Sequence, residues 1–409
     1  MINACSERVK WSDQGYYLSE RPSFTLDPLF HAGAYYVQEA SSMFLEQALK
    51  QALDLSAPLK VLDLCAAPGG KSTLIQSLIS AESLLVSNEV IRTRVNVLTE
   101  NLIKWGATNV VVSNNDPKDF QRLNRYFDVI VVDAPCSGSG LFRKDPNSIV
   151  EWSENNVQLC CQRQQRILTD IIPALKEGGL LIYSTCSYSP EEDEDIADWL
   201  IRSFHLNSVK LQVKDDWNIV ETLSPEKNAF CYRFFPNKVK GEGFFITVLK
   251  DGGTLSGIQK RNQKKNNGSI SADELSAITP FVKDMAGLFF FPLNDWILAL
   301  PEHFKTELDT LQNSLYIKKA GVRLGTVIRK EMIPDHELAL STIIHEGLPC
   351  VEFDEKTALV YLRREEIRLD HFPVGWVLVK YQGLPLGWVK VMTHRINNYY
   401  PQHWRILNK

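Results

Sequence analysis

At 409 residues the chain is long enough for two or three domains of ordinary size. With 44% hydrophobic and 23% charged residues its composition is that of a globular protein, which excludes a disordered or fibrous one. The net charge of −4 gives no overall sign of a nucleic-acid partner. No apolar run approaches the roughly 20 residues that cross a bilayer, and the first ten residues lack a signal peptide's apolar stretch. We therefore expect a cytoplasmic protein with no membrane partner.

Residues 60–249 alternate short apolar runs with segments of helical length. Continuous apolar runs of this kind are typical of parallel strands that helices cover on both faces. The pattern predicts an α/β fold with a doubly wound, mostly parallel sheet, which binds ligands at the carboxyl ends of its strands. The predicted strands are KVLDLCAAP, LLVSNE, NVVVSNND, FDVIVVDAPC, LLIYSTCS and FFITVLK.

The first predicted strand runs into a turn rich in small residues before a helix begins. Two glycines in this turn allow the backbone to approach a ligand at the helix N-terminus, as in nucleotide-binding α/β proteins. The turn matches neither the dinucleotide-binding motif nor the ATPase phosphate-binding motif, so nicotinamide and ATP are disfavoured. Its residues are Cys65, Ala66, Ala67, Pro68, Gly69, Gly70 and Lys71.

An acid follows each of the next two predicted strands, Glu89 and then Asp116. A carboxylate in the first position can accept hydrogen bonds from ribose hydroxyls, and one in the second can position an adenine amino group. The alternative is that each acid only caps the following helix. Because both acids follow a Gly-rich first turn, a nucleoside cofactor is favoured.

Two cysteines, Cys136 and Cys186, end the fourth and fifth predicted strands. One buried cysteine is usually a packing residue, but two at neighbouring strand ends would place both thiols beside the cofactor pocket. A thiolate is strongly nucleophilic, and Lys71 could raise the thiolate population. We expect the other six cysteines to pack, with Cys65 also in the cofactor turn. No Cys and His cluster has zinc spacing, so no metal is expected.

After residue 250 comes a stretch rich in Gly, Ser, Asn and Lys, which is typical of a linker. A strand and a helix are expected over residues 289–315, and strands again from residue 321. In the tail, residues 375–383 and 384–391 read as neighbouring strands. Residues 371–409 contain no acid but hold Lys380, Lys390, Arg395 and Arg405 among the aromatic residues Trp376, Trp388, Tyr399, Tyr400 and Trp404. This mixture suits RNA binding by phosphate attraction and base stacking, although a basic β-rich cap is the alternative.

Three segments closely resemble the RNA cytosine-5 methyltransferases, the family of the bacterial Sun, RsmB and RsmF enzymes and the eukaryotic NSUN proteins. They are DLCAAPGGK at residues 63–71, DAPCSGSG at residues 133–140 and STCSYSPEEDE at residues 184–194. The resemblance continues through residues 233–245. It includes residues 372–390, which look like the PUA-like RNA-binding end of the RsmF type.

The resemblance implies a Rossmann-like class I methyltransferase domain that binds S-adenosylmethionine through residues 65–71, Glu89, Asp116 and Asp133. In this family the cysteine at Cys186 adds to carbon 6 of cytosine, and Asp133 stabilises a proton at ring nitrogen 3. The cysteine at Cys136 assists release of the product, and Lys71 organises the pocket. The target base must be unpaired or flipped out of its stack.

The expected domain order follows from these segments. A short N-terminal segment spans residues 1–35, the methyltransferase domain 36–250, a linker 251–275, a small α+β domain 276–345 and a PUA-like domain 346–409. Relatives usually carry a longer N-terminal RNA-binding segment before residues 16–44, and this departure bears on RNA affinity more than on chemistry. The expected partner is small-subunit (16S) ribosomal RNA or the assembling subunit, and the expected state is a monomer.

Two alternatives to this function remain. One is a non-catalytic RNA-binding factor of ribosome assembly that keeps the fold, which both cysteines and the cofactor acids argue against. The other is a DNA cytosine-5 methyltransferase, in which the nucleophile would be the cysteine at the position of Cys136. The presence of Cys186 and of the PUA-like tail argues against DNA as the substrate.

Overall fold

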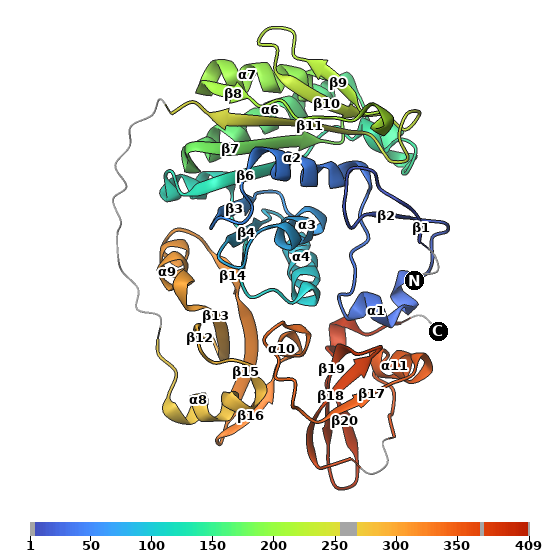
Figure 1. Cartoon of the computed structure of the whole chain (residues 1–409), viewed down its shortest axis with the longest axis vertical. Helices are drawn as coiled ribbons and strands as arrows, with labels where there is room; N and C mark the ends of the chain where they lie inside the picture. Colours follow the sequence, from blue (N-terminus) through green and yellow to red (C-terminus); the bar gives the residue numbers. More distant parts are fainter. Residues whose placement is uncertain (1–4, 254–267, 369–371, 408–409) are drawn as a thin grey trace.

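The computed structural model describes residues 5–253, 268–368 and 372–407 of the chain. Most of the predicted linker, residues 254–267, lies outside the described residues, as do residues 1–4, 369–371 and 408–409. A large sheet with its helices occupies one end of the molecule (Figure 1). Two smaller sheets occupy the other end.

The large sheet has ten strands in the described residues, nine of them in the order β14-β5-β4-β3-β6-β7-β11-β10-β9, while β8 pairs with β11. Its five central strands are parallel, and β11 runs antiparallel to β7. All six strands predicted between residues 60 and 250 are confirmed. The strands are β3 (Lys60–Asp63), β4 (Leu84–Asn88), β5 (Val110–Ser113), β6 (Phe127–Asp133), β7 (Leu175–Thr185), β8 (Leu206–Ser208), β9 (Val220–Leu223), β10 (Phe230–Phe234), β11 (Phe244–Asp251) and β14 (Ile317–Ala320).

Helices cover both faces of this sheet. Alternate side chains of one strand enter opposite cores, so that Val131 packs on one face and Val132 on the other. Helices α2, α3 and α4 supply apolar residues to the first core, and α6, α7 and α9 supply them to the second. Their bounds are α2 (Leu45–Ala52), α3 (Gly70–Leu78), α4 (Arg92–Trp105), α6 (Glu154–Ile171), α7 (Glu194–Phe204) and α9 (Lys305–Ser314), with the short α5 (Asn147–Glu151) between β6 and α6.

Strand β14 reaches this sheet from beyond the linker. It pairs antiparallel with β5, from Ile317 opposite Ser113 to Ala320 opposite Val111. The preceding Tyr316 is fixed by Asn115, whose side-chain oxygen accepts its N–H at 2.9 Å. The segment predicted as a separate domain over residues 276–345 therefore shares a sheet with the strands of residues 60–251.

Two four-stranded sheets form the rest of the C-terminal half, in the orders β12-β13-β15-β16 and β17-β18-β19-β20. The region expected as one strand and a helix holds two strands before α9, because an Asn294–Asp295 turn divides it. The predicted tail hairpin is confirmed as β18 and β19. The elements are α8 (Ala272–Ile278), β12 (Leu288–Leu293), β13 (Trp296–Pro301), β15 (Val322–Ile328), β16 (Glu331–Pro334), α10 (His336–Leu340), β17 (Cys350–Glu352), α11 (Glu355–Leu362), β18 (Gly375–Tyr381), β19 (Leu384–Val391) and β20 (Ile396–Asn398).

Two of the tail aromatics expected to stack on bases are core residues. The side chains of Trp388 and Tyr400 have no solvent exposure, so the stacking prediction is wrong for both. Trp388 Nε1 donates to the Asp335 carbonyl oxygen at 2.9 Å, which joins the two small sheets. Sequence alone could not separate these residues from Tyr399, which is 37% exposed.

The N-terminal segment packs against the C-terminal tail. It contains β1 (Cys5–Arg8), β2 (Tyr16–Leu18) and the short α1 (Pro28–His31). His31 Nδ1 lies 3.1 Å from the hydroxyl oxygen of Tyr400, a residue close to the other end of the chain. The ammonium of Lys104 on α4 lies 5.1 Å from the ring centres of both Phe30 and Trp404. The two ends of the chain and the large sheet therefore meet at one place.

Candidate active site

The Gly-rich turn joins β3 to α3 at the carboxyl edge of the parallel strands. The Ala66 N–H donates to the Asn88 carbonyl oxygen at 2.8 Å, which ties the turn to the end of β4. Gly69 adopts φ +119°, a conformation that favours glycine. Arg94 donates to the Ala67 carbonyl oxygen at 2.6 Å, so α4 also holds the turn in place.

Lys71 and Asp133 form an ion pair at the centre of this edge. The ammonium of Lys71, on the first turn of α3, lies 2.7 Å from Asp133 Oδ2 at the end of β6. The Ser184 hydroxyl of β7 donates to Asp133 Oδ1 at 2.8 Å. Burial alone would lower the pKa of Lys71, but the Asp133 carboxylate outweighs it and raises this pKa. The Asp133 side chain keeps 36% of its surface exposed, so a ligand can still reach it.

The two predicted thiols face each other. Cys136 follows β6, Cys186 follows β7, and their Sγ atoms lie 3.1 Å apart. The backbone holds the two loops together, because the Gly140 N–H donates to the Cys186 carbonyl oxygen at 2.8 Å. A Cβ atom on Gly140 would lie only 2.6 Å from that oxygen, so the loop needs glycine here.

The two thiols differ in acidity. A hydrogen bond from the Cys136 thiol lowers the pKa of Cys186 against the opposing effect of burial, and the Lys71 charge lowers it further. The same hydrogen bond, together with burial, raises the pKa of Cys136 well above that of a free thiol. Cys186 is therefore the more acidic thiol of the pair, and the thiolate is the reactive form of a cysteine.

A buried glutamate, Glu192, joins the two thiol loops, and the sequence did not single it out. Its Oε1 accepts the Ser137 N–H at 2.9 Å and its Oε2 accepts the Ser187 hydroxyl at 2.7 Å. Ser137 follows Cys136, and Ser187 follows Cys186. Gln164 of α6 also donates to Glu192 Oε1 at 3.1 Å. The only sequence signal for this role was the place of Glu192 in the quoted segment 184–194.

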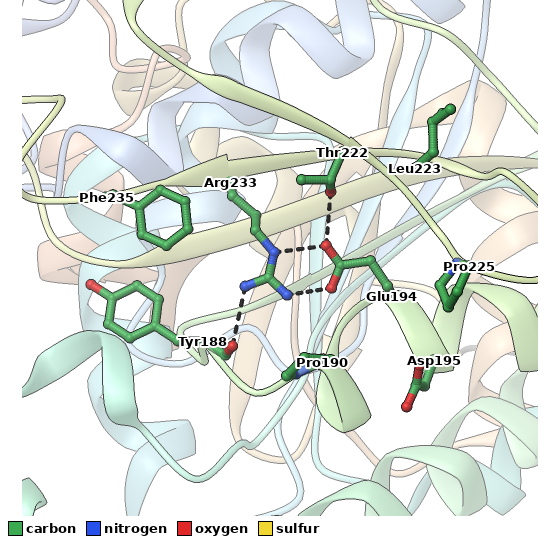
Figure 2. Close-up of a pocket in the computed structure, with 9 residues that line it drawn as sticks. All are labelled: Tyr188, Pro190, Glu194, Asp195, Thr222, Leu223, Pro225, Arg233 and Phe235. Carbon is green, nitrogen blue, oxygen red and sulfur yellow. Dashed lines mark hydrogen bonds and ion pairs between the residues drawn. The ribbon is translucent and has the colours of Figure 1, made fainter.

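Arg233 of β10 fixes the far end of the Cys186 loop (Figure 2). Its Nε donates to Glu194 Oε1 at 2.7 Å, and its Nη1 donates to the Tyr188 carbonyl oxygen at 3.3 Å. The ring of Tyr188 stacks on Phe235 with centres 5.6 Å apart. These residues border a hollow of about 400 Å³ beside the loop. No role for Arg233 was predicted from the sequence, because its ion pairs join distant segments.

The predicted cofactor acids lie along the same edge. Glu89 is buried, its Oε1 accepts the Ile91 N–H at 2.9 Å, and its Oε2 lies 3.2 Å from Arg94. Asp116 caps the 3-10 helix 117–123 by accepting the Lys118 N–H at 3.2 Å, and it pairs with Arg166 at 3.3 Å. The helix cap weighed as the alternative for Asp116 is therefore present, and its role toward a cofactor stays a prediction.

These residues fit S-adenosylmethionine. Asp63 Oδ1 is buried without a hydrogen-bond partner within the described residues, and the buried Glu89 Oε2 has only its ion pair with Arg94. Such carboxylate oxygens suit hydroxyl and ammonium donors, and their charge suits a sulfonium cation. Asp63, which the sequence did not single out as a site residue, has its pKa raised to about 7 by burial.

None of the remaining six cysteines lies in surroundings that favour a nucleophile. Burial raises the pKa of Cys65, which therefore stays protonated in the cofactor turn. Cys160 and Cys231 are buried and Cys161 is partly buried, as expected. Cys5 and Cys350 are exposed, so the packing prediction is wrong for them.

The described part of the chain has neither a metal-binding cluster nor a membrane-spanning helix. Residues 5–253, 268–368 and 372–407 contain no group of three or more His, Cys, Asp or Glu side chains placed to hold a metal ion. No helix within these residues is long and apolar enough to span a membrane.

Comparisons with known proteins match the chain in three parts. The family described as "16S rRNA methyltransferase RsmB/F" matches residues 50–250. The "Methyltransferase RsmF PUA domain" matches residues 348–406, and the "N-terminal domain of 16S rRNA methyltransferase RsmF" matches residues 2–40. The three matches follow one another in the order of the RsmF type.

Individual relatives support the same family. The ribosomal RNA small subunit methyltransferase F of Shewanella piezotolerans is 28% identical over 96% of this chain and 84% of its own length. The protein of the same name from Aeromonas salmonicida is 29% identical over 97% and 84%. A crystal structure of a methyltransferase homolog from Pyrococcus horikoshii is 31% identical, with a TM-score of 0.50 over 60% of this chain and 77% of that one. The chain therefore belongs to the RsmB/F family, whose members are S-adenosylmethionine-dependent RNA cytosine-5 methyltransferases.

Proposed function

We propose that the protein methylates carbon 5 of a cytosine in small-subunit (16S) ribosomal RNA, with Cys186 as the covalent nucleophile. The observation that carries the proposal is the pair of thiols 3.1 Å apart, of which Cys186 is the more acidic. The relatives' names support the RNA class. We further propose that the protein acts as a monomer in the cytoplasm on the free RNA or the assembling subunit.

The chemistry begins with the nucleophile. Carbon 5 of cytosine is a poor nucleophile, so the Cys186 thiolate first adds to carbon 6, which makes carbon 5 enamine-like. Asp133 stabilises the proton at ring nitrogen 3 as charge builds there, and it is exposed enough to reach a bound base. S-adenosylmethionine, when bound, supplies the methyl group as a sulfonium cation. Lys71 holds Asp133 in place through their 2.7 Å ion pair.

Release completes the reaction. A solvent base takes the carbon 5 proton of the methylated adduct, its electron pair forms the double bond between carbons 5 and 6, and the bond between carbon 6 and Cys186 Sγ breaks with its pair on sulfur, which returns the thiolate. Cys136 assists this step, since its thiol lies beside the sulfur that leaves. The target base must stand out of its stack for Cys186 to reach the ring face.

A label-transfer experiment tests this function. Purified protein is incubated with tritiated S-adenosylmethionine and either total RNA or DNA, and we expect label in RNA only. Label in DNA only would establish the DNA alternative, and label in neither would favour the non-catalytic assembly factor. The exposed Cys350 supplies a matched control, because Cys350→Ala should transfer label like the wild type whereas Cys186→Ala should not.

The target nucleotide needs a separate measurement. Bisulfite sequencing of ribosomal RNA from a strain lacking the protein should show one cytosine of the small-subunit RNA losing its protection. Unchanged small-subunit RNA, with a lost signal in another RNA, would overturn the proposed target but not the reaction.

A further inference from the structure

A groove of about 830 Å³ lies where the large sheet meets both small sheets, apart from the thiol pair. One wall is the outer face of α4, including Asn96 and Glu100, and another comes from β13–β16 and α10. The third wall is the C-terminal tail, with Tyr399 and Trp404. In Figure 1 α4, α10 and β15 are drawn near one another around this junction. The volume is within the range of about 300–1,000 Å³ found for ligand sites.

The groove carries aromatic surface from one small sheet and from the C-terminal tail. Trp296 begins β13, and the guanidinium of Arg323 stacks over it at 4.6 Å. Tyr399 is 37% exposed, and Trp404 is partly exposed. Flat aromatic side chains beside a cation are the usual means of binding unpaired bases irrespective of sequence. The groove is thus built for stacking.

A buried histidine with unused hydrogen-bonding capacity lines the same groove. His336 is 7% exposed, and neither ring nitrogen has a hydrogen-bond partner within the described residues. Burial lowers its pKa to about 3, so the ring is neutral at pH 7 and offers one donor and one acceptor. Such a ring suits a base edge or a ribose hydroxyl better than a phosphate. Leaving buried polar nitrogens unpaired is costly, so a bound group that pairs with either nitrogen would stabilise this wall of the groove.

The charges of the groove favour a nucleotide over a multiply charged anion. Its three acids are already paired, Glu100 with Lys104, Asp335 with Arg323 and Glu337 with Lys319. Lys318, at the rim, is exposed and has no ion pair or hydrogen bond in the described part of the chain. One free ammonium beside stacking rings matches one backbone phosphate beside one or two bases.

We propose that this groove binds an unpaired nucleotide of the RNA substrate, distinct from the cytosine that is methylated. The inference rests on the proposed function in taking RNA as the substrate. The groove lies between the helix that follows Glu89 and the PUA-like tail, so it joins the proposed cofactor edge to a region expected to bind RNA. Trp296 and Tyr399 stack on the base, His336 contacts its polar edge, and Lys318 contacts a phosphate.

Photo-crosslinking of the full chain tests the site directly. The probe is an unpaired RNA oligonucleotide with 4-thiouridine at several positions, irradiated with wild-type protein and digested for mass spectrometry. We expect crosslinked peptides that contain Trp296, Tyr399 or Trp404. Crosslinks confined to the thiol loops, or to surfaces outside the groove, would overturn the proposal.

Binding by variants gives a second readout. Trp296→Ala should weaken binding of the same oligonucleotide about fivefold or more, as for loss of one base-stacking ring, and Trp296→Phe should restore it. His336→Phe, which keeps the ring but not its nitrogens, should weaken binding about threefold or more. Lys356→Gln, an exposed lysine on α11 outside the groove, is the matched control and should bind like the wild type. Wild-type affinity in both Trp296→Ala and His336→Phe, with folding verified by circular dichroism, would refute the site.

The two proposals fail separately. Label transfer from tritiated S-adenosylmethionine on the same protein preparation reports the proposed function alone. Groove crosslinks without methyl transfer would reject the proposed function and keep the nucleotide site. Methyl transfer to RNA without groove crosslinks would reject the nucleotide site and keep the proposed function.

Discussion

Cys136 and Cys186 have the same side chain but different chemical tendencies, which come from their surroundings. The thiol of Cys136 donates toward Cys186 at 3.1 Å, and the Lys71 charge adds to the stabilisation of the Cys186 thiolate. Burial opposes charge on both sulfurs, so only the one that receives a hydrogen bond becomes the more acidic. The difference in acidity that the proposed roles of the two thiols require is thus present without a bound substrate.

Replacing Cys136 should make Cys186 less reactive at neutral pH. The largest effect that lowers the pKa of Cys186 is the hydrogen bond from Cys136, so in Cys136→Ala this pKa rises toward or above its usual range. The thiolate fraction at pH 7 therefore falls, and the pH profile of Cys186 alkylation shifts to higher pH. Mass spectrometry of iodoacetamide labelling between pH 6 and pH 10 measures the shift. An unchanged profile would show that Cys136 does not stabilise the thiolate.

At the residue scale the sequence predicted the two thiols, Lys71 and Asp133 as one cluster, because motifs at neighbouring strand ends must meet at one sheet edge. The sequence did not predict that Glu192 would join the two thiol loops, nor did it predict the ion pairs of Arg233. From sequence, a glutamate in an acidic run is expected to be exposed. In the structure Glu192 is buried, and Ser137 and Ser187 donate hydrogen bonds to it. Burial of a charge depends on distant partners that a local pattern does not contain.

At the scale of elements, three loops meet around Gly140. The Gly243 N–H donates to the Gly140 carbonyl oxygen at 3.0 Å, and the Gly140 N–H donates to the Cys186 carbonyl oxygen at 2.8 Å. These contacts leave no space for a side chain, since a Cβ atom would also lie 2.8 Å from the Gly243 carbonyl oxygen. The spacing of β6, β7 and β11 at their ends thus determines how close the thiols come.

Gly140→Ala should therefore lower the methyl-transfer rate about tenfold or more, as a displacement near 1 Å does at other catalytic groups. Single-turnover methylation with saturating RNA measures it. Gly178→Ala is the control, because Gly178 is left-handed at φ +68° on the exposed start of β7 and a Cβ atom there meets nothing within 4 Å. It should cost about 1 kcal/mol of stability without slowing transfer. Equal rates for Gly140→Ala and wild type would contradict the packing argument.

Arg233 should contribute more to stability than an exposed arginine in a similar ion pair. Its side chain is 9% exposed and faces both Asp193 and Glu194, so Arg233→Ala leaves buried carboxylates without a cation. We expect a loss of about 3–5 kcal/mol in the free energy of unfolding, from urea denaturation. Arg202→Ala, which breaks an exposed 2.6 Å pair with Glu226, should cost about 1 kcal/mol or less. Similar losses in both variants would show that the Arg233 cluster is not structurally dominant.

Across the whole molecule, both chain ends and the large sheet meet near Tyr400 and Lys104, and β14 extends the catalytic sheet from the C-terminal half. The sequence predicted the central strands because parallel strands buried on both faces read as continuous apolar runs. It did not predict β14, whose four residues, IKKA, include two lysines and pair with a strand some two hundred positions earlier. Its tail prediction failed at Trp388 and Tyr400, because a local pattern does not show which aromatic residues the fold buries.

RNA binding by the tail should depend on salt through its exposed cations. Deleting the tail would remove core residues, so point variants are the better test. Replacing the exposed Arg395 and Arg405 by glutamine should flatten the plot of log affinity against log salt by about 0.7 for each phosphate contact with single-stranded RNA. Filter binding between 50 and 300 mM salt measures the slope, with Lys356→Gln as the control. A slope equal to that of the wild type would show that neither arginine contacts the backbone.

Covalent trapping tests the central claim most directly. Wild-type protein, Cys136→Ala, Cys186→Ala and the double variant are incubated with labelled RNA and S-adenosylmethionine and separated on a denaturing gel. We predict that Cys136→Ala accumulates an RNA-linked protein, and that Cys186→Ala and the double variant form none. An adduct in Cys186→Ala, together with none in Cys136→Ala, would assign the nucleophile to Cys136 and contradict the account.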